Sequence, residues 1–353
     1  MQKRTGRIAV VVLVGAGVLA CLVAGCGRKP QAAAPTVTDT LLLAAYTVPK
    51  EAYEKEIVPA FQKHWLAKTG HAVNVQQSYE ASGAQARAVA GGFEADVVAL
   101  SLEGDVDKVT EAGLITHDWK QQPYGGFITR SLVVIGTREG NPKHIQDWED
   151  LTRAGVDVIY PNPKTSGGAM WGVNAIYGAG LKMSEAAKGQ PDPAYARDLL
   201  KRVQAQVKVM DKSGRESVTT FERGVGDALV TYENEVLLRN MQGRPIPFVI
   251  PRATILIENP AAVVDKNADK HGARALAEEF VSYLQTPEAQ RAFAKFGFRP
   301  ASPEIMAEVQ ARFPAAPLQF DIGYLGGWTQ VRKILYGEQG VWTQVTQELG
   351  QGQ

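Results

Sequence analysis

Cysteine is nearly absent from this sequence, which has two in 353 residues, Cys21 and Cys26. Everything beyond residue 26 therefore lacks a thiol, and this excludes disulfides, thiolate catalysis and cysteine-based metal sites from the long remainder of the chain. The five histidines are scattered, and none has the spacing of a metal motif such as HExxH. The sequence predicts neither a metal nor a cofactor.

An excess of charge of one sign is also missing. Three of the 38 basic residues lie within the first 25, and the other 35 face 37 acidic residues. A basic field is the usual footprint of a nucleic-acid-binding protein, so we expect no nucleic acid as partner. No internal repeat stands out.

Apolar runs long enough to span a membrane are lacking too. Lys3, Arg4 and Arg7 precede an apolar run over residues 8–20, which is shorter than the roughly 20 residues of a membrane-spanning helix. A basic start followed by a short apolar segment is typical of an export signal. We therefore expect residues 1–25 to be a signal peptide.

The end of this segment reads LVAGC over residues 22–26 and resembles the lipobox of bacterial lipoproteins. The resemblance implies cleavage before Cys26, a lipid on its thiol, and a membrane anchor. Residues 26–39 are rich in Ala, Pro, Gln and Thr, which suits a tether between anchor and body. An ordinary signal peptide followed by a chance cysteine is the alternative.

The remaining body is long enough to bury a large core and to form two domains. Strand-like runs at 41–46, 72–77 and 95–100 alternate with helical patterns at 51–67 and 82–90. Such alternation indicates an α/β protein with mostly parallel sheets flanked by helices. A new block begins near Phe127, so we expect two lobes, the first from residues 40–126 and 252–347 and the second from residues 127–251.

The segment PNPKTSGGA, residues 161–169, has the pattern of a strand end, a turn and a helix start. Ser166 can cap the helix, while Gly167 and Gly168 allow a ligand to approach the backbone closely. Free N–H groups at a helix start attract an anion without any help from Lys or Arg. A plain helix cap is the alternative.

Two other places share this pattern of strand end, hydroxyl residue and helix. Ser82 follows the strand at 72–77, and Ser217 opens VTTFERG after a strand at 207–210. Ligands of open α/β sheets bind at the carboxyl ends of strands, so the three starts are expected to converge on one cleft. By contrast, surface charge or an ion pair between lobes is a more typical role than a direct anion contact for Arg130, Arg138, Arg215 and Arg223.

These segments, with AYTVPKEAY, REGNPKHIQDWEDL and TYENE, resemble the periplasmic sulfate-binding proteins of bacterial ABC importers from Leu41 to about Gln347. The resemblance implies the two-lobed periplasmic-binding-protein fold of type II, with a ligand cleft between the lobes. It also implies a monomer outside the cytoplasm that closes around dehydrated sulfate, delivers it to permease subunits, and is not an enzyme.

The resemblance also assigns ligand contacts. Ser82, Ser166, Gly167 and Gly168 match the anion-contacting positions of the family without change. Thr47 stands where the family has Asp, and Tyr232 where it has an indole donor. Ser217 stands where Ala is common, and its hydroxyl could be a further donor.

Two substitutions leave the identity of the bound anion open. Sulfate carries no proton, so a site made of donors satisfies it, whereas the O–H of hydrogen phosphate would face donors at a cost of about 1–3 kcal/mol. Thr47 removes a possible acceptor and Tyr232 adds one. Thiosulfate, phosphate, molybdate or an organic sulfonate are therefore alternatives.

Two other classes of function were weighed on the same residues. An exported hydrolase could use Ser82 or Ser166 as nucleophile, but neither lies in a G-x-S-x-G motif. A lipoprotein that only binds partners is the third class, and the retained glycines argue against it.

Overall fold

The computed structural model describes residues 37–351. The expected signal peptide, Cys26 and the tether up to residue 36 lie outside this range. Within it, no helix combines the length and apolarity needed to cross a membrane.

The first third of the described chain alternates strands with helices, as the sequence predicts. Helices α1 and α2 form one continuous helical stretch, joined by a π-helical turn over Tyr53–Ile57. The elements are β1 (Thr38–Tyr46), α1 (Lys50–Ala52), α2 (Val58–Thr69), β2 (Ala72–Glu80), α3 (Ser82–Ala90), β3 (Val97–Ala99) and α4 (Glu103–Glu111).

The middle third begins with a long strand and returns to the same alternation. Its elements are β4 (Phe127–Thr137), β5 (Val158–Ile159), α5 (Gly167–Lys188), α6 (Pro193–Gln204), β6 (Val207–Val209), α7 (Gly214–Glu222), β7 (Ala228–Tyr232), α8 (Glu233–Met241) and β8 (Phe248–Val249). The expected short helix near Asp147 is a 3₁₀ helix over Trp148–Thr152.

The last third holds one long strand and mostly helices. They are β9 (Ala253–Val263), α9 (Asp265–Lys270), α10 (Arg274–Leu284), α11 (Pro287–Lys295), β10 (Arg299–Pro300), α12 (Pro303–Val309), β11 (Leu318–Phe320), α13 (Gly327–Val331) and α14 (Val341–Glu348). The sequence predicted a strand only over residues 261–264. It missed the first part of β9 because Thr254, Glu258 and Asn259 interrupt the apolar run, and each of these side chains is hydrogen-bonded inside the fold.

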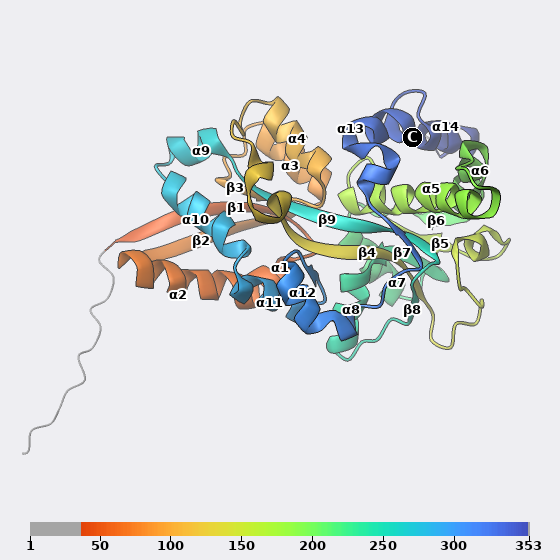
Figure 1. Cartoon of the computed structure of the whole chain (residues 1–353), viewed down its shortest axis with the longest axis horizontal. Coiled ribbons are helices and arrows are strands. Elements are labelled where there is room, and N and C mark those ends of the chain that lie inside the picture. Colours follow the sequence, from red (N-terminus) through yellow and green to blue (C-terminus); the bar gives the residue numbers. More distant parts are fainter. Residues whose placement is uncertain (1–36, 352–353) are drawn as a thin grey trace, which may run out of the picture. The chain divides into compact units, whose positions relative to one another are not determined.

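One continuous sheet has the strand order β2-β1-β3-β9-β4-β7-β5-β6, while β8 and β10 pair with β4, and β11 pairs with β9. Its two ends are parallel: β1 pairs with β2 and β3, and β5 pairs with β6 and β7. The central strands β4 and β9 run antiparallel to each other and to their outer neighbours β7 and β3. Figure 1 shows these two long strands side by side.

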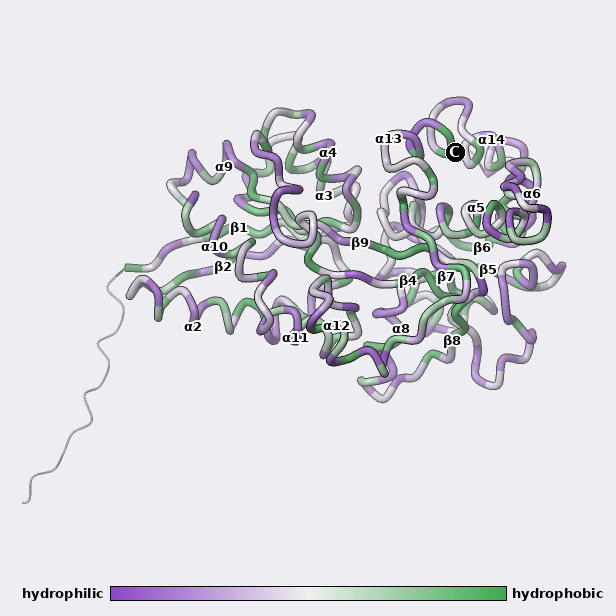
Figure 2. The backbone as a smooth tube through the Cα atoms, in the orientation of Figure 1, coloured by the Kyte–Doolittle hydropathy of each residue, from purple (hydrophilic) through white to green (hydrophobic). Residues whose placement is uncertain are grey.

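The buried apolar residues of the described chain gather around the sheet. The long strands β1, β4 and β9 are mostly apolar, whereas helices such as α2 and α9 alternate polar and apolar positions along the chain (Figure 2). The largest hydrophobic cluster joins residues from β1, α2, α5, β9 and α10. This core positions the carboxyl ends of β1, β2, β5, β6 and β7, after which the predicted ligand contacts lie.

The C-terminal elements contact residues of both predicted lobes. Helix α14 packs on α6, where Arg197 pairs with Glu348. Arg332, just after α13, pairs instead with Asp107 of α4 at 3.2 Å. The boundaries that we expect for the two lobes stay a prediction.

Candidate anion-binding site

The start of α5 has the geometry that the sequence predicts. Ser166 is the capping residue in an extended conformation, and its hydroxyl accepts a hydrogen bond from the N–H of Ala169 at 3.4 Å. Among the described residues, no acceptor faces the N–H groups of Gly167 and Gly168. Two backbone donors at the positive end of a 22-residue helix are thus available for an anion.

The start of α3 lies next to that of α5. Ser82 is the first residue of α3 rather than its cap, and its Oγ donates to Asp105 Oδ2 at 2.6 Å. A Cβ on Gly83 would lie 3.0 Å from the carbonyl oxygen of Thr165, the residue before the α5 cap. The two helix starts are therefore in contact.

The start of α7 is four residues earlier than the sequence interpretation had it. Ser213 is the cap, and its hydroxyl accepts the N–H of Glu216 at 3.2 Å. Ser217 lies inside the helix, where its N–H bonds the Ser213 carbonyl and its hydroxyl bonds Asp211 at 2.9 Å. The interpretation of Ser217 as the residue that opens the helix is wrong, because Ser213 provides the same cap chemistry four residues upstream. The N–H groups at this helix start belong to Gly214 and Arg215.

Thr47 and α7 are brought together by the residue that follows Thr47. Thr47 is half-buried directly after β1. A Cβ on Gly214 would lie 3.7 Å from the Val48 side chain, and Arg215 donates to the Val48 carbonyl at 2.9 Å. The turn at Thr47 therefore lies beside the first residues of α7.

Tyr232 connects the Thr47 turn to α5. Its ring packs edge-on against Tyr46 with a centroid distance of 6.4 Å. Its hydroxyl lies 3.4 Å from where a Cβ on Gly168 would be. Burial raises the pKa of the Tyr232 phenol well above its ordinary value, so the phenol keeps its proton and can donate.

The sequence interpretation missed Ser101, which follows β3 and is fully buried. Its N–H donates to Ser82 Oγ at 2.9 Å, and its hydroxyl bonds the Tyr232 hydroxyl at 2.6 Å. The signal was present, because a hydroxyl residue directly after a buried strand is the pattern that singled out Ser82. Ser101 places Ser82, Gly167, Gly168 and Tyr232 around one point.

Arg215 pairs here with carboxylates of neighbouring helices, so it does not form an open cationic surface. Arg215 pairs with Glu51 of α1 at 2.5 Å and with Glu235 of α8 at 3.0 Å. Burial pushes the pKa of Glu51 upward, but the Arg215 guanidinium outweighs it and holds that pKa below its ordinary value. Of the two roles expected for Arg215, the structure shows an ion pair rather than free surface charge.

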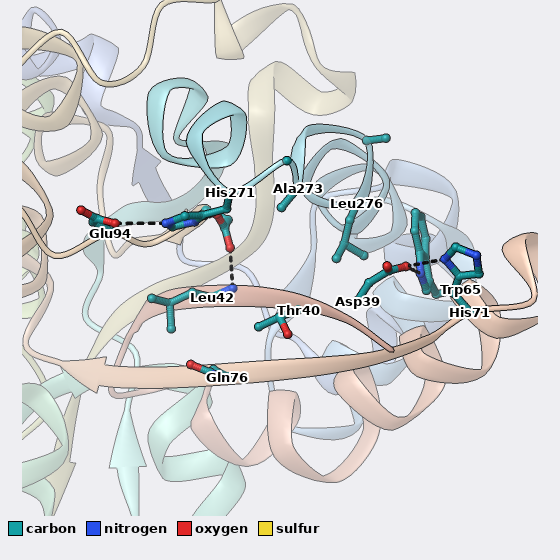
Figure 3. A pocket seen from close by; sticks show the side chains of 13 residues that line it. Asp39, Thr40, Leu42, Trp65, His71, Gln76, Glu94, His271, Ala273 and Leu276 are labelled. Carbon is teal, nitrogen blue, oxygen red and sulfur yellow. Dashed lines mark hydrogen bonds and ion pairs between the residues drawn. The ribbon is translucent and has the colours of Figure 1, made fainter. Parts of the chain in front are cut away.

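A cavity of about 810 Å³ lies elsewhere, between β1, β2 and the start of α10 (Figure 3). Its polar groups are paired with one another: Asp39 accepts from the Trp65 indole and bonds His71, while His271 bonds Asp96 and Glu94. None of the predicted ligand contacts lines it. Between residues 37 and 351, no group of three or more His, Cys, Asp or Glu side chains is arranged to hold a metal ion.

Residues 41–299 match the family described as bacterial extracellular solute-binding protein. The chain belongs to this family. A sulfate-binding protein of Synechococcus elongatus is 42% identical over 331 residues, which cover 92% of each chain. A thiosulfate-binding protein of Pseudomonas aeruginosa is 36% identical, over 86% of this chain and 91% of that protein.

Solved structures agree with the family. The sulfate-binding protein SubI from Mycobacterium tuberculosis superposes with a TM-score of 0.76 and 36% identity, over 84% of this chain and 99% of that one. The predicted two-lobed α/β fold is confirmed by this likeness. The family consists of solute-binding proteins rather than enzymes.

Proposed function

We propose that this chain binds sulfate between its two lobes outside the cytoplasm and delivers it to the permease subunits of an ABC importer. The proposal is supported by relatives named for sulfate binding at 42% identity over nearly the whole chain. The observation that carries it is that the starts of α3 and α5 meet beside Ser101 and Tyr232. The N–H groups of Gly167 and Gly168 are unpartnered there among the described residues.

We assign the anion contacts to Thr47, Ser82, Ser166, Gly167, Gly168 and Tyr232, and add the N–H groups of Gly214 and Arg215. The hydroxyls of Ser217 and Ser82 are the least supported of the predicted contacts, since they already donate to Asp211 and Asp105. The assigned groups carry no net positive charge apart from the Arg215 side chain, which is paired. Sulfate, whose oxygens are all acceptors, suits such a set of donors.

Asp105 is a buried carboxylate beside Ser82, one of these donors. Its Oδ2 accepts from Ser82, and its Oδ1 pairs with Lys108 at 2.7 Å. Because both oxygens are engaged inside the protein, Asp105 is not the free acceptor that a protonated anion would need. This favours sulfate or thiosulfate over hydrogen phosphate.

Thiosulfate is the second candidate ligand. It is also fully ionised near neutral pH, and a relative at 36% identity is named for it. The two anions differ in size and in one sulfur atom. Because both are fully ionised, a shared set of donors accommodates both.

Closure would bring the lobes together around the anion, with bending near Phe127 and Pro251, where the chain passes between them. We further propose that residues 1–25 are an export signal and that a lipid on Cys26 holds the protein at the membrane. In this arrangement the protein acts as a monomer next to its permease.

Isothermal calorimetry of the purified chain tests the proposal. Sulfate should bind with one-to-one stoichiometry and raise the melting temperature, because a ligand that binds only the folded state stabilises it. Thiosulfate should compete with sulfate, and phosphate at equal concentration should not. No heat and no thermal shift at millimolar sulfate would contradict the proposal.

A further inference from the structure

Ser101 is held in place by its backbone. Its carbonyl accepts the indole N–H of Trp171 at 2.8 Å and the side-chain amide of Asn259 at 2.7 Å. Its N–H donates to Ser82 Oγ at 2.9 Å. These partners belong to α5, β9 and α3, so the position of Ser101 is fixed by three separate elements before any ligand binds.

The Ser101 hydroxyl lies at the proposed anion contacts. A Cβ on Gly167 would come within 2.6 Å of Ser101 Oγ, and one on Gly168 within 3.4 Å of the Tyr232 hydroxyl. The two hydroxyls, 2.6 Å apart, therefore lie beside the first two residues of α5. Both residues are buried, so bulk water does not complete their hydrogen bonds.

We propose that Ser101 is a specificity-determining residue of the oxyanion site, which donates to the Tyr232 oxygen and so turns the phenol into a donor only. This inference rests on the proposed function. A phenol is a better donor than an aliphatic hydroxyl, and the anion is the strongest acceptor nearby. The favoured order is thus Ser101 O–H to Tyr232 oxygen, and Tyr232 O–H to the anion, each bond polarising the next.

This order settles how many hydrogens the pair offers. The two hydroxyls carry two hydrogens, one is used between them, and one reaches the ligand. An indole N–H in place of Tyr232 would also offer one hydrogen and no acceptor. Ser101 thereby occupies the acceptor that a phenol adds, so the Tyr232 oxygen is not available to the O–H of hydrogen phosphate.

Removal of the Ser101 hydroxyl frees the Tyr232 oxygen. That oxygen can then accept the O–H of hydrogen phosphate while the phenol donates to a neighbouring oxygen of the same anion. Sulfate gains nothing from the change, because it has no hydrogen to give. The affinity ratio of sulfate to phosphate is thus the quantity that reports on Ser101.

The test is calorimetry of the full chain with sulfate and with inorganic phosphate at about pH 8. Ser101→Ala should change the sulfate affinity less than about threefold but lower the sulfate-to-phosphate ratio about tenfold, as one recovered hydrogen bond to an anion would. Tyr232→Phe should weaken sulfate binding about tenfold or more. In the double variant, the loss of Ser101 should have no further effect on the ratio, because Ser101 acts through Tyr232.

Ser184→Ala is the matched control, since Ser184 is a buried serine bonded to Leu181 near the other end of α5, and it should leave both affinities unchanged. An unchanged ratio in Ser101→Ala, or a change that persists in the Tyr232→Phe background, would overturn the role of Ser101 alone. If the parent chain binds neither anion, the proposed function fails and this inference fails with it. Melting curves without ligand verify that each variant is folded.

Discussion

At the scale of single residues, the two glycines at the start of α5 differ in what surrounds them. A Cβ on Gly167 would come within 2.9 Å of the Ser101 side chain at two atoms, so a substitution there must displace it. A Cβ on Gly168 would meet the Ser166 hydroxyl at 3.3 Å and the Tyr232 ring at 3.4 Å, which small movements relieve. Gly168 is therefore the cleaner position at which to test close approach of an anion.

We expect Gly168→Ala to weaken sulfate binding by about tenfold or more while the melting temperature stays within a few degrees. The methyl group fills space at the proposed anion contacts, whereas the helix itself gains about 0.5–1 kcal/mol from the replacement of glycine by alanine. Calorimetry and thermal melting measure the two effects.

Gly172→Ala serves as the control for this prediction, because Gly172 lies in the same helix and its added Cβ would be 3.2 Å from Val230. It should affect stability alone. Equal losses of affinity in both variants would mean that the helix, and not the approach of the anion, is disturbed.

At the scale of elements, the sequence predicted most helices and strands, and α3 begins and ends where it placed this helix. Its errors have specific physical causes. The start of α7 was misplaced because two serines four residues apart can both act as caps. The first part of β9 was missed because its polar residues have partners inside the fold. Ser101 has the local pattern of a hydroxyl residue after a buried strand, but its contact with Tyr232, a residue 131 positions away, cannot be predicted from local sequence.

A histidine connects segments that lie far apart in the sequence. His271, at the end of α9, bonds Asp96 at 2.7 Å and Glu94 at 3.1 Å. Asp96 also accepts the N–H of Leu42 in β1. Hydrogen bonds to Asp96, and then to Glu94, raise the pKa of His271 above its ordinary value.

This raised pKa predicts a pH dependence of stability. The folded state binds the His271 proton more tightly than the unfolded state, so the stabilisation is complete below about pH 6.5 and is lost as the pH rises through the folded pKa. We expect a loss of about 0.5 kcal/mol, since the pair is partly exposed. Urea unfolding from pH 5.5 to 8.5 measures it.

The His271→Gln variant isolates this effect, because its free energy of unfolding should lack the part of the pH dependence that comes from His271. His144→Gln, at an exposed loop position, should keep it. A parent chain and a His271→Gln variant with parallel pH profiles would show that the proton on His271 is irrelevant to stability.

At the scale of the whole molecule, ion pairs hold the two predicted lobes against each other. Arg215 joins α7 to α1 through Glu51 and to α8 through Glu235, whose side chain is fully buried. We expect Arg215→Ala to lower the free energy of unfolding by about 3 kcal/mol, because it leaves buried carboxylate without its main partner. Urea unfolding measures the difference.

Arg291→Ala is the matched control, since the Arg291–Glu308 pair is half-exposed and should contribute less than about 1 kcal/mol. Arg215→Lys should recover part of the lost stability, because it keeps the charge but not the forked geometry. A loss as small in Arg215→Ala as in Arg291→Ala would contradict a structural role for the pair between lobes.

The central strands β4 and β9 also impose an order on folding. Val97 of β3 pairs with Val263 of β9, so the first parallel sheet gains its inner neighbour only after the ribosome has made the whole second block. Contacts between residues so distant in sequence form slowly, because the intervening chain must first be confined. We therefore expect β1, β2 and β3 to lack their native neighbour until residue 263 has been synthesised, which delays the compaction of the first block.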